Sequence, residues 1–216
     1  MIPESNVIRV SRQVDRCRVL GPGIRTVLWV QGCPLRCPGC TTPEALAFEG
    51  GSDIGVENLA QAIAAIPDVD GVTYSGGEPT SQAYGLTQLT RRLRQLRPEF
   101  GFMSYTGFVF EEIVARGNTQ EIEFLRELDL LVDGPYIAAR HTDLRWRGSD
   151  NQRVLFLSEK YRSSEQAILD RGVWMEFSNS ASSLEFSGIP PRGFLRKFER
   201  AMSRQGVHVS TQEIDS

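Results

Sequence analysis

The sequence predicts an α/β fold built on a parallel sheet, and two patterns lead to that prediction. Short apolar runs rich in β-branched and aromatic residues alternate along the 216-residue chain with longer segments of helical periodicity. Residues of distinctive chemistry follow these apolar runs directly. The carboxyl ends of parallel strands meet at one edge of a sheet, so we expect these residues to form a site there.

The expected strands differ in character along the chain. Val7–Val10 is a short β-branched run, which suits an edge strand. Thr26–Val30 is almost continuously apolar, as a parallel strand buried on both faces requires. The other expected strands are Gly71–Ser75, Gly101–Tyr105, Leu130–Val132, Val154–Leu157 and Val173–Phe177.

The expected helices lie between these strands. In Tyr84–Leu96 the leucines fall on one face and the arginines on the opposite face, which is the pattern of a helix packed on a sheet. Val56–Ile66 also has helical periodicity and ends at Pro67, because proline cannot continue a helix. The remaining expected helices are Phe110–Leu128, with a break at Gly117-Asn118, then Ser164–Arg171 and Phe194–Met202.

The composition favours a single domain over residues 1–209, followed by a polar tail over residues 210–216. The net charge of −3 indicates no bulk attraction to nucleic acid or to anionic membranes. No apolar run approaches the length of a membrane span, and the first residues lack the features of a secretory leader. We therefore expect a cytoplasmic protein with no membrane and no nucleic-acid partner.

Three cysteines, Cys33, Cys37 and Cys40, lie within eight residues on a loop rich in glycine and proline. Thiols at this spacing are typical ligands of a metal or an iron–sulfur cluster. Three thiolates satisfy three irons of a cubane [4Fe–4S] cluster and leave the fourth iron open. An open coordination position is typical of a metal centre that carries out chemistry.

Two other interpretations of these cysteines remain open. A structural zinc site needs four ligands, and the fourth would be Cys17 or one of two distant histidines, His141 and His208. A disulfide is the other alternative, although a reducing compartment disfavours it. Cys17 itself matches no motif, and we expect it to be a buried structural thiol.

Other short segments along the chain, together with the cysteine motif, form a family signature. The segments Gly21–Thr26, Gln31–Cys40 and Ser75–Pro79 occur in this order. They are followed by Ser104–Gly107, Leu131–Pro135 and Trp146–Arg153. From about Val7 to Arg153 the chain resembles radical S-adenosylmethionine enzymes of the glycyl-radical activating branch. Within that branch it is most similar to activating enzymes of anaerobic ribonucleoside-triphosphate reductases.

The resemblance implies a fold, cofactors and partners. The fold would be an open partial (β/α) barrel of about six parallel strands. The cofactors would be one [4Fe–4S] cluster and S-adenosylmethionine, whose reductive cleavage yields methionine and a 5′-deoxyadenosyl radical. The substrate would be a large glycyl-radical protein. Since the chain has no second cysteine cluster, a flavodoxin or ferredoxin would donate the electron.

Several residues after the expected strands are candidate cofactor contacts. Gly76 and Gly77 would let the backbone approach a ligand closely, and Glu78 would accept a hydrogen bond from the methionyl amine, as the resemblance implies. Thr106 would line the cofactor site, and Asp133 would either bond the cofactor or hold its own loop. A plain turn after the strand is the alternative for Gly76–Glu78 and for Thr106.

The segment Arg140–Arg153 carries several arginines and is a second candidate region. Arginine binds carboxylates through two parallel hydrogen bonds, so the segment would clamp the cofactor carboxylate or contact a partner protein. We favour such a role for Asn151, Gln152 and Arg153. A solvated loop is the alternative.

One departure from the family keeps other functions open. Members of the branch commonly have His-Asn after the third cysteine, where this chain has Thr41-Thr42. The leading expectation is an activating enzyme that installs a glycyl radical on a partner protein. A radical enzyme that modifies a peptide or small molecule is the alternative, and a non-enzymatic iron–sulfur or zinc protein is the third hypothesis.

Overall fold

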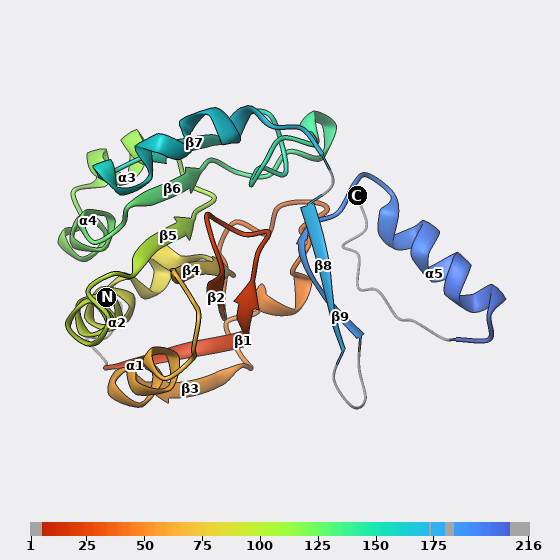
Figure 1. Cartoon of the computed structure of the whole chain (residues 1–216). Helices are drawn as coiled ribbons and strands as arrows, with labels where there is room; N and C mark the ends of the chain where they lie inside the picture. The colour runs from red at the N-terminus through yellow and green to blue at the C-terminus, as the bar shows by residue number, and fades with distance from the viewer. Residues whose placement is uncertain (1–5, 173, 180–183, 208–216) are drawn as a thin grey trace.

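A seven-stranded sheet forms the centre of the molecule in the computed structural model, which describes residues 6–172, 174–179 and 184–207 (Figure 1). The strand order is β3-β1-β2-β4-β5-β6-β7. The strands are β1 (Val7–Cys17), β2 (Arg25–Val30), β3 (Ser52–Gly55), β4 (Gly71–Gly76), β5 (Gly101–Tyr105), β6 (Leu130–Asp133) and β7 (Arg153–Phe156).

The sheet is parallel only at its centre. Strands β2, β4, β5 and β6 run parallel to one another, whereas β1, β3 and β7 are antiparallel to their neighbours. The expected count of about six parallel strands is therefore wrong. A parallel pair needs a crossover connection, usually a helix, and the link from β6 to β7 contains only a short 3-10 turn, so β7 returns antiparallel.

The N-terminal strand also differs from expectation. The run Val7–Val10 begins a strand of 11 residues, and β3 lies outside it, so β1 is not the edge of the sheet. The strands expected from Gly71, Gly101 and Leu130 are present as β4, β5 and β6.

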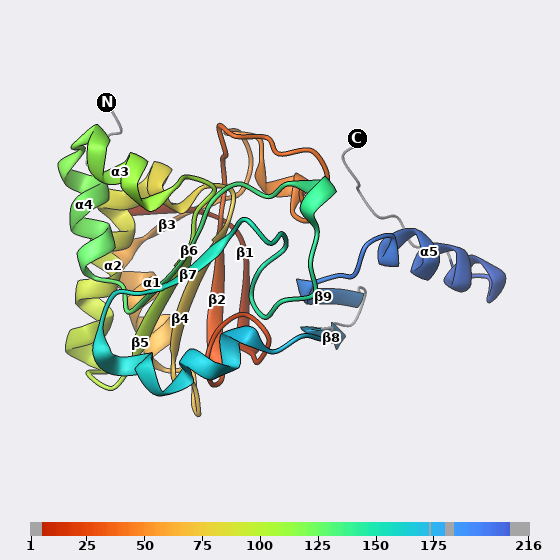
Figure 2. The same cartoon turned by 90° about the horizontal axis from the view of Figure 1, so that it is seen from above.

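Four helices cover one face of the sheet: α1 (Val56–Ala64), α2 (Ala83–Leu96), α3 (Phe110–Arg116) and α4 (Thr119–Arg126) (Figure 2). The expected break between α3 and α4 is confirmed. Gly117 ends α3 in the left-handed conformation with φ of 66°, which glycine adopts without strain. Asn118 then caps α4 by accepting hydrogen bonds from the backbone N–H groups of Gln120 and Glu121.

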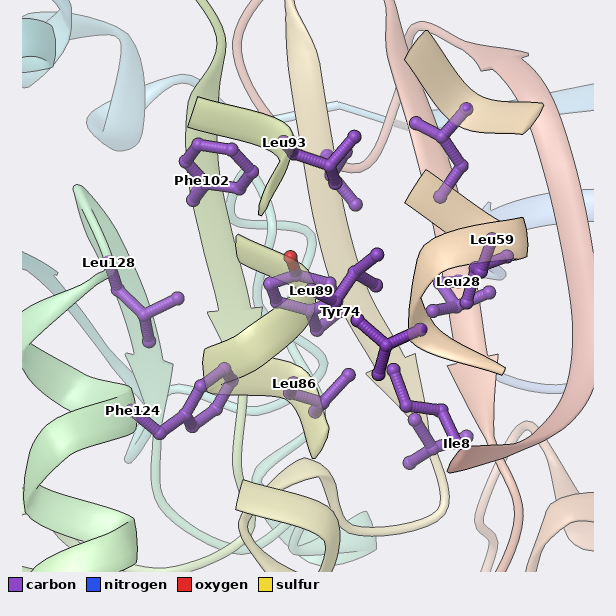
Figure 3. Close-up of a cluster of buried hydrophobic side chains, with 14 of the residues drawn as sticks. Ile8, Leu28, Leu59, Tyr74, Leu86, Leu89, Leu93, Phe102, Phe124 and Leu128 are labelled. Carbon is purple, nitrogen blue, oxygen red and sulfur yellow. The ribbon is translucent and has the colours of Figure 1, made fainter. Parts of the chain in front are cut away.

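The main hydrophobic core lies between this helical layer and the sheet (Figure 3). Side chains alternate along each strand, so Leu28, Tyr74 and Phe102 point toward the helices, where Leu89 and Phe124 meet them. The intervening residues of the same strands point to the opposite face of the sheet. That face is free of helices α1 to α4 and holds the site described below.

The chain after β7 forms a separate group of elements. The helix expected over Ser164–Arg171 is present as 3-10 turns, η4 (Glu159–Leu169). The expected last strand is β8 (Trp174–Asn179), but it pairs only with β9 (Leu184–Ile189), outside the main sheet. Val173 and the tail over 210–216 lie outside the described residues. The terminal helix is α5 (Phe194–Arg204).

The β8–β9 hairpin packs against the face of the sheet that the first four helices leave uncovered. Arg12 of β1 donates a hydrogen bond to the Phe186 carbonyl (3.2 Å), and the Arg18 backbone N–H donates to the Glu176 carboxylate (2.9 Å). Helix α5 projects beyond the hairpin, away from the sheet (Figures 1 and 2). In the part of the chain that the structure describes, no helix is long and apolar enough to cross a membrane.

Candidate functional site

A cavity of about 1060 Å³ lies at the carboxyl ends of β2, β4 and β5, on the face opposite the helical layer. Its walls come from four parts of the chain. The loop after β2 supplies the three cysteines, the ends of β4 and β5 supply Gly76–Glu78 and Tyr105–Gly107, and the loop after β6 supplies Tyr136 and His141. The hairpin and α5 form the remaining wall.

The cysteine loop is folded tightly onto the segment that follows it. The backbone N–H groups of Gly32 and Cys33 donate to the carbonyls of Ala45 (2.8 Å) and Leu46 (3.1 Å), around the short turn η1 (Pro43–Ala45). The Gln31 side chain donates to two further carbonyls of the same segment. Within the loop, Arg36 and Gly39 have positive φ values, so the chain reverses direction between the cysteines.

All three motif cysteines line the cavity as free thiols. Burial raises the pKa of Cys33, while backbone N–H groups of Leu35 and Arg36 act in the opposite direction. Burial also raises the pKa of Cys37, against the effect of the Tyr136 backbone N–H. A bound metal would offset this cost of burial, because it holds its ligands as thiolates.

The arrangement of the thiols fits a cluster. Among the described residues, no three histidine, cysteine or carboxylate side chains converge as the ligands of a single metal ion do. A cubane takes each thiolate on a different iron, and all three motif cysteines line the same cavity. Three such donors fit a [4Fe–4S] cluster with one open iron better than a four-ligand zinc ion.

Gly76 and Gly77 line the cavity. We expected their missing side chains to make room for a ligand, but the structure shows that they make room for neighbouring backbone. A Cβ on Gly77 would lie less than 3.0 Å from the carbonyl oxygens of Gly32 and Ala45, and one on Gly76 would collide with the backbone of β2. The Glu78 N–H also donates to the Gly32 carbonyl (2.8 Å). The glycines therefore allow the end of β4 to pack on the cysteine loop.

Glu78 is buried and connects the loops after β4 and β5. Its Oε1 accepts hydrogen bonds from the Thr80 backbone (2.9 Å), the Thr80 hydroxyl (2.8 Å) and the Thr106 hydroxyl (2.9 Å). Its Oε2 accepts one, from the Gly107 backbone (2.9 Å). Burial raises the pKa of Glu78, and these donors oppose that shift. A carboxylate oxygen accepts more than one hydrogen bond, so Oε2 has capacity for a further donor.

Thr106 and Gly107 belong to the same arrangement. Thr106 is 3% exposed, and besides bonding Glu78 its hydroxyl accepts from the Phe108 backbone (3.2 Å). A Cβ on Gly107 would overlap the Leu35 side chain, so the cysteine loop packs directly against the end of β5. The structure thus brings the cysteines, Gly76–Glu78 and Thr106 together at one cavity.

Asp133 lies elsewhere, and strand alternation explains its position. Leu131 points toward the helical core, and Asp133, two residues later on β6, shares that side of the sheet. It accepts a hydrogen bond from the Phe110 backbone (2.8 Å) and forms an ion pair with Arg153. Arg153 also pairs with Glu111. Asp133 therefore holds its own loop and α3, which was one of its two expected roles.

The other candidates in the loop after β6 are also engaged within it. Gln152 lines the cavity, but its Oε1 accepts from the backbones of Gly148 and Ser149. The Asn151 amide donates to the Pro135 carbonyl (2.8 Å), and neither Asn151 nor Arg153 lines the cavity.

The arginines of the same segment make contacts away from the cavity. Arg140 pairs with Asp150 and Arg145 with Asp170, while Arg147 bonds the Ile168 carbonyl. None of these arginines lines the cavity. Clamping of a carboxylate by this segment therefore finds no geometric support in the structure.

Sequence reasoning missed several residues of the cavity wall. Trp29 of β2 is buried yet lines the cavity, with the Arg12 guanidinium 4.0 Å from its ring centroid. Tyr105 also lines it, and its buried hydroxyl has no hydrogen-bond partner among the described residues. Strand alternation was the available signal, because both residues occupy the face opposite Leu28 and Phe102.

The C-terminal wall was missed as well. Phe177 of β8 stacks on Phe198 of α5 (5.7 Å between ring centroids), and Phe194 stacks on Phe198 (5.8 Å). Phe194, Phe198 and Met202 form one apolar side of α5, and they line the cavity together with Phe177 of β8. The spacing of apolar residues in α5 carried that signal.

Cys17 lies outside the cavity wall, as expected of a structural thiol. It is fully buried beside Leu20, Val27 and Trp29. Burial raises its pKa to about 12, and a hydrogen bond with Glu176 acts in the same direction.

Comparison with known proteins gives a consistent set of relatives. The model of the family described as a 4Fe-4S single cluster domain matches residues 19–155. The anaerobic ribonucleoside-triphosphate reductase-activating protein of Enterobacteria phage T4 is 30% identical over 140 residues, 63% of this chain and 86% of the relative. The protein of the same name from Escherichia coli K12 is 29% identical over 143 residues, 63% and 90% of the two chains.

A second kind of relative matches more of the chain. The pyruvate formate-lyase-activating enzyme of Staphylococcus aureus USA300 is 27% identical over 195 residues, 79% of this chain and 75% of the relative. The family match ends at residue 155, within β7. The segment with η4, the hairpin and α5, which we call the C-terminal extension (residues 156–207), lies beyond it.

Proposed function

Because the chain belongs to the single-cluster 4Fe-4S family of radical S-adenosylmethionine activating enzymes, we propose that it generates a glycyl radical on a partner protein. One observation carries the proposal. Cys33, Cys37 and Cys40 line the same cavity as Glu78 and Gly107, so a cluster held by the three cysteines would adjoin a buried carboxylate. The four parallel strands would be the central part of the open (β/α) barrel implied by the resemblance.

Each residue would have a defined task at this site. The three cysteines would hold three irons of a [4Fe–4S] cluster, and Glu78 Oε2 would accept a hydrogen bond from the methionyl ammonium of S-adenosylmethionine. Thr80 and Thr106 would keep the Glu78 carboxylate in place. When bound and reduced by one electron, the cofactors supply a carbon-centred radical able to take a hydrogen atom from a C–H bond.

Such a radical must be shielded from water and from stray hydrogen donors. Leu35, Trp29 and the aromatic residues of the C-terminal extension give part of the cavity an apolar wall. The electron would come from another protein, since the sequence has a single cysteine outside the motif. A flavodoxin or ferredoxin would be this donor. By analogy with the relatives, an anaerobic ribonucleotide reductase would be the partner.

A second candidate function has an observation of its own. The C-terminal extension walls part of the cavity, although a large protein substrate would itself close an open mouth. A cavity already partly enclosed also suits a peptide or small-molecule substrate. This chain would then be a radical S-adenosylmethionine enzyme of a biosynthetic pathway.

The test is anaerobic turnover of the cluster-loaded protein with dithionite, S-adenosylmethionine and the large chain of anaerobic ribonucleotide reductase from the same organism. We expect 5′-deoxyadenosine together with a glycyl-radical doublet in the electron paramagnetic resonance spectrum of the reductase. Without the reductase, cleavage should be slow. Cleavage at full rate with no radical on the reductase would contradict the proposal and favour the second candidate. A protein that never cleaves S-adenosylmethionine would contradict both.

A further inference from the structure

Arg192 occupies a rigid turn at the rim of the cavity. It lies between Pro191 and Gly193, in the link from β9 to α5. The Phe194 N–H donates to the Pro191 carbonyl (2.9 Å), and Gly193 has φ of 70° and ψ of 11°. These values are those of the third position of a type II turn, which requires a positive φ and favours glycine. The turn and the preceding prolines fix the backbone that carries Arg192.

Arg192 faces the part of the cavity wall that adjoins the cysteines. It lines the cavity together with Tyr136 and His141, whose hydroxyl and Nδ1 are 3.2 Å apart. Burial raises the pKa of Tyr136 and lowers the pKa of His141. The positive charge of Arg192 lowers the pKa of each of these two residues. The Tyr136 ring packs on the cysteine loop, 3.4 Å from the place that a Cβ on Gly39 would take. Arg192 therefore lies near the proposed cluster ligands.

Arg192 differs from the other two arginines of the cavity wall, Arg12 and Arg196, by having no partner among the described residues. Arg12 stacks on Trp29 and donates to the Phe186 carbonyl, and Arg196 has an interaction within the chain. The arginines of the loop after β6 are paired away from the cavity, as described above. Arg192 is exposed, lines the cavity, and makes no hydrogen bond or ion pair with any described residue.

We propose that Arg192 binds the methionyl carboxylate of S-adenosylmethionine, an assignment that rests on the proposed function. The methionyl group carries an ammonium and a carboxylate on one carbon. Glu78 supplies a negative charge for the first, and Arg192 supplies a positive charge for the second. A guanidinium binds a carboxylate through two parallel hydrogen bonds, which fixes its orientation as well as its position. The residue belongs to the C-terminal extension, so the extension takes part in cofactor binding.

The test is equilibrium dialysis under anaerobic conditions with the cluster-loaded protein in its oxidised state, so that no turnover occurs. The probes are S-adenosylmethionine and decarboxylated S-adenosylmethionine, which lacks only the carboxylate. Arg192→Gln should weaken binding of S-adenosylmethionine about tenfold, a moderate loss because the residue is exposed, and should leave the decarboxylated analogue unaffected. Arg192→Lys should retain part of the affinity, because it keeps the charge and loses the planar fork.

The matched control is Arg200→Gln, which removes the same charge from an exposed position of α5 that does not line the cavity. It should bind both probes like the wild type. Unchanged affinity of Arg192→Gln for S-adenosylmethionine would overturn the assignment, and so would equal weakening for both probes. Either of these two outcomes would leave the proposed function unaffected, provided that the wild type binds S-adenosylmethionine. A wild type that binds neither probe would overturn both.

Discussion

Replacing Glu78 by glutamine tests whether this buried carboxylate serves the fold, the cofactor or both. Glutamine keeps the shape of the side chain and one oxygen. That oxygen can take the place of Oε1 and accept the three hydrogen bonds from Thr80 and Thr106. The amide nitrogen then occupies the place of Oε2, where it faces the Gly107 N–H as a second donor.

The magnitude follows from that single mismatch. One hydrogen bond to a charged acceptor is lost, which contributes about 1.5–3 kcal/mol in buried sites. We expect the free energy of unfolding of Glu78→Gln to fall by about this amount. If Oε2 also accepts from the methionyl ammonium, the affinity for S-adenosylmethionine should fall about ten- to a hundredfold.

Two assays separate the effects. Urea denaturation of the protein gives the change in stability, and equilibrium dialysis of the oxidised, cluster-loaded protein gives the affinity. Glu44→Gln is the control, because Glu44 also lines the cavity but its exposed side chain makes no hydrogen bond among the described residues. Lower stability with unchanged affinity would show that Glu78 only joins the two loops. Unchanged stability would refute the hydrogen-bond argument itself.

Four further predictions have definite expected outcomes. Cys33→Ala should abolish the cluster, whereas Cys17→Ala should retain about four irons per chain in an iron assay. Cys17 should resist iodoacetamide at pH 8 in the folded protein, as read by mass spectrometry. Its pKa of about 12 lowers the thiolate fraction roughly a thousandfold relative to a pKa of 9.0. Because the folded-state pKa is raised, the contribution of Cys17 to the free energy of unfolding is fully present below about pH 9 and is lost as the pH rises toward 12. Gly77→Ala should lower the free energy of unfolding by about 1–3 kcal/mol, because the added Cβ would collide with backbone oxygens. The control is Gly172→Ala, where the atom nearest to the added Cβ lies 3.6 Å away, and it should be almost neutral in the same denaturation assay. Phe198→Ala removes two ring contacts, each contributing about 0.5–1.5 kcal/mol. It should speed backbone hydrogen exchange in the β8–β9 hairpin but not in β4. A hairpin that exchanges at the wild-type rate would contradict this packing.

The sequence was sufficient for the elements that local patterns determine. Continuous apolar runs predicted the central parallel strands, and Gly117-Asn118 predicted the boundary between α3 and α4, because both depend on neighbouring residues alone. The direction of β7 could not be predicted in this way. It depends on whether the connection after Asp133 crosses the sheet, which is a property of a whole loop.

The candidate site shows the same division. The motif cysteines and Gly76–Glu78 could be grouped from the sequence, since they follow adjacent parallel strands. Alternation along β6 places Asp133 on the same side of the sheet as Leu131, which faces the helical core. Only this count of alternate residues shows that Asp133 lies outside the cavity that Thr106 lines. Arg192 carried no comparable signal, because its proximity to the cavity depends on how the extension packs back on the sheet.

The contact between Gly77 and the carbonyl of Gly32 also has a consequence for the order in which the protein matures. The cysteine loop depends on the end of β4 for its shape, since Glu78 and Gly77 donate hydrogen bonds to Gly32 and Val30. Until the β4 segment has been synthesised and has paired beside β2, only the contacts with Ala45 and Leu46 order the cysteine loop. A cluster should therefore be held more firmly once β4 has docked, and a nascent chain that ends before Gly77 should retain iron less well than one that includes β4.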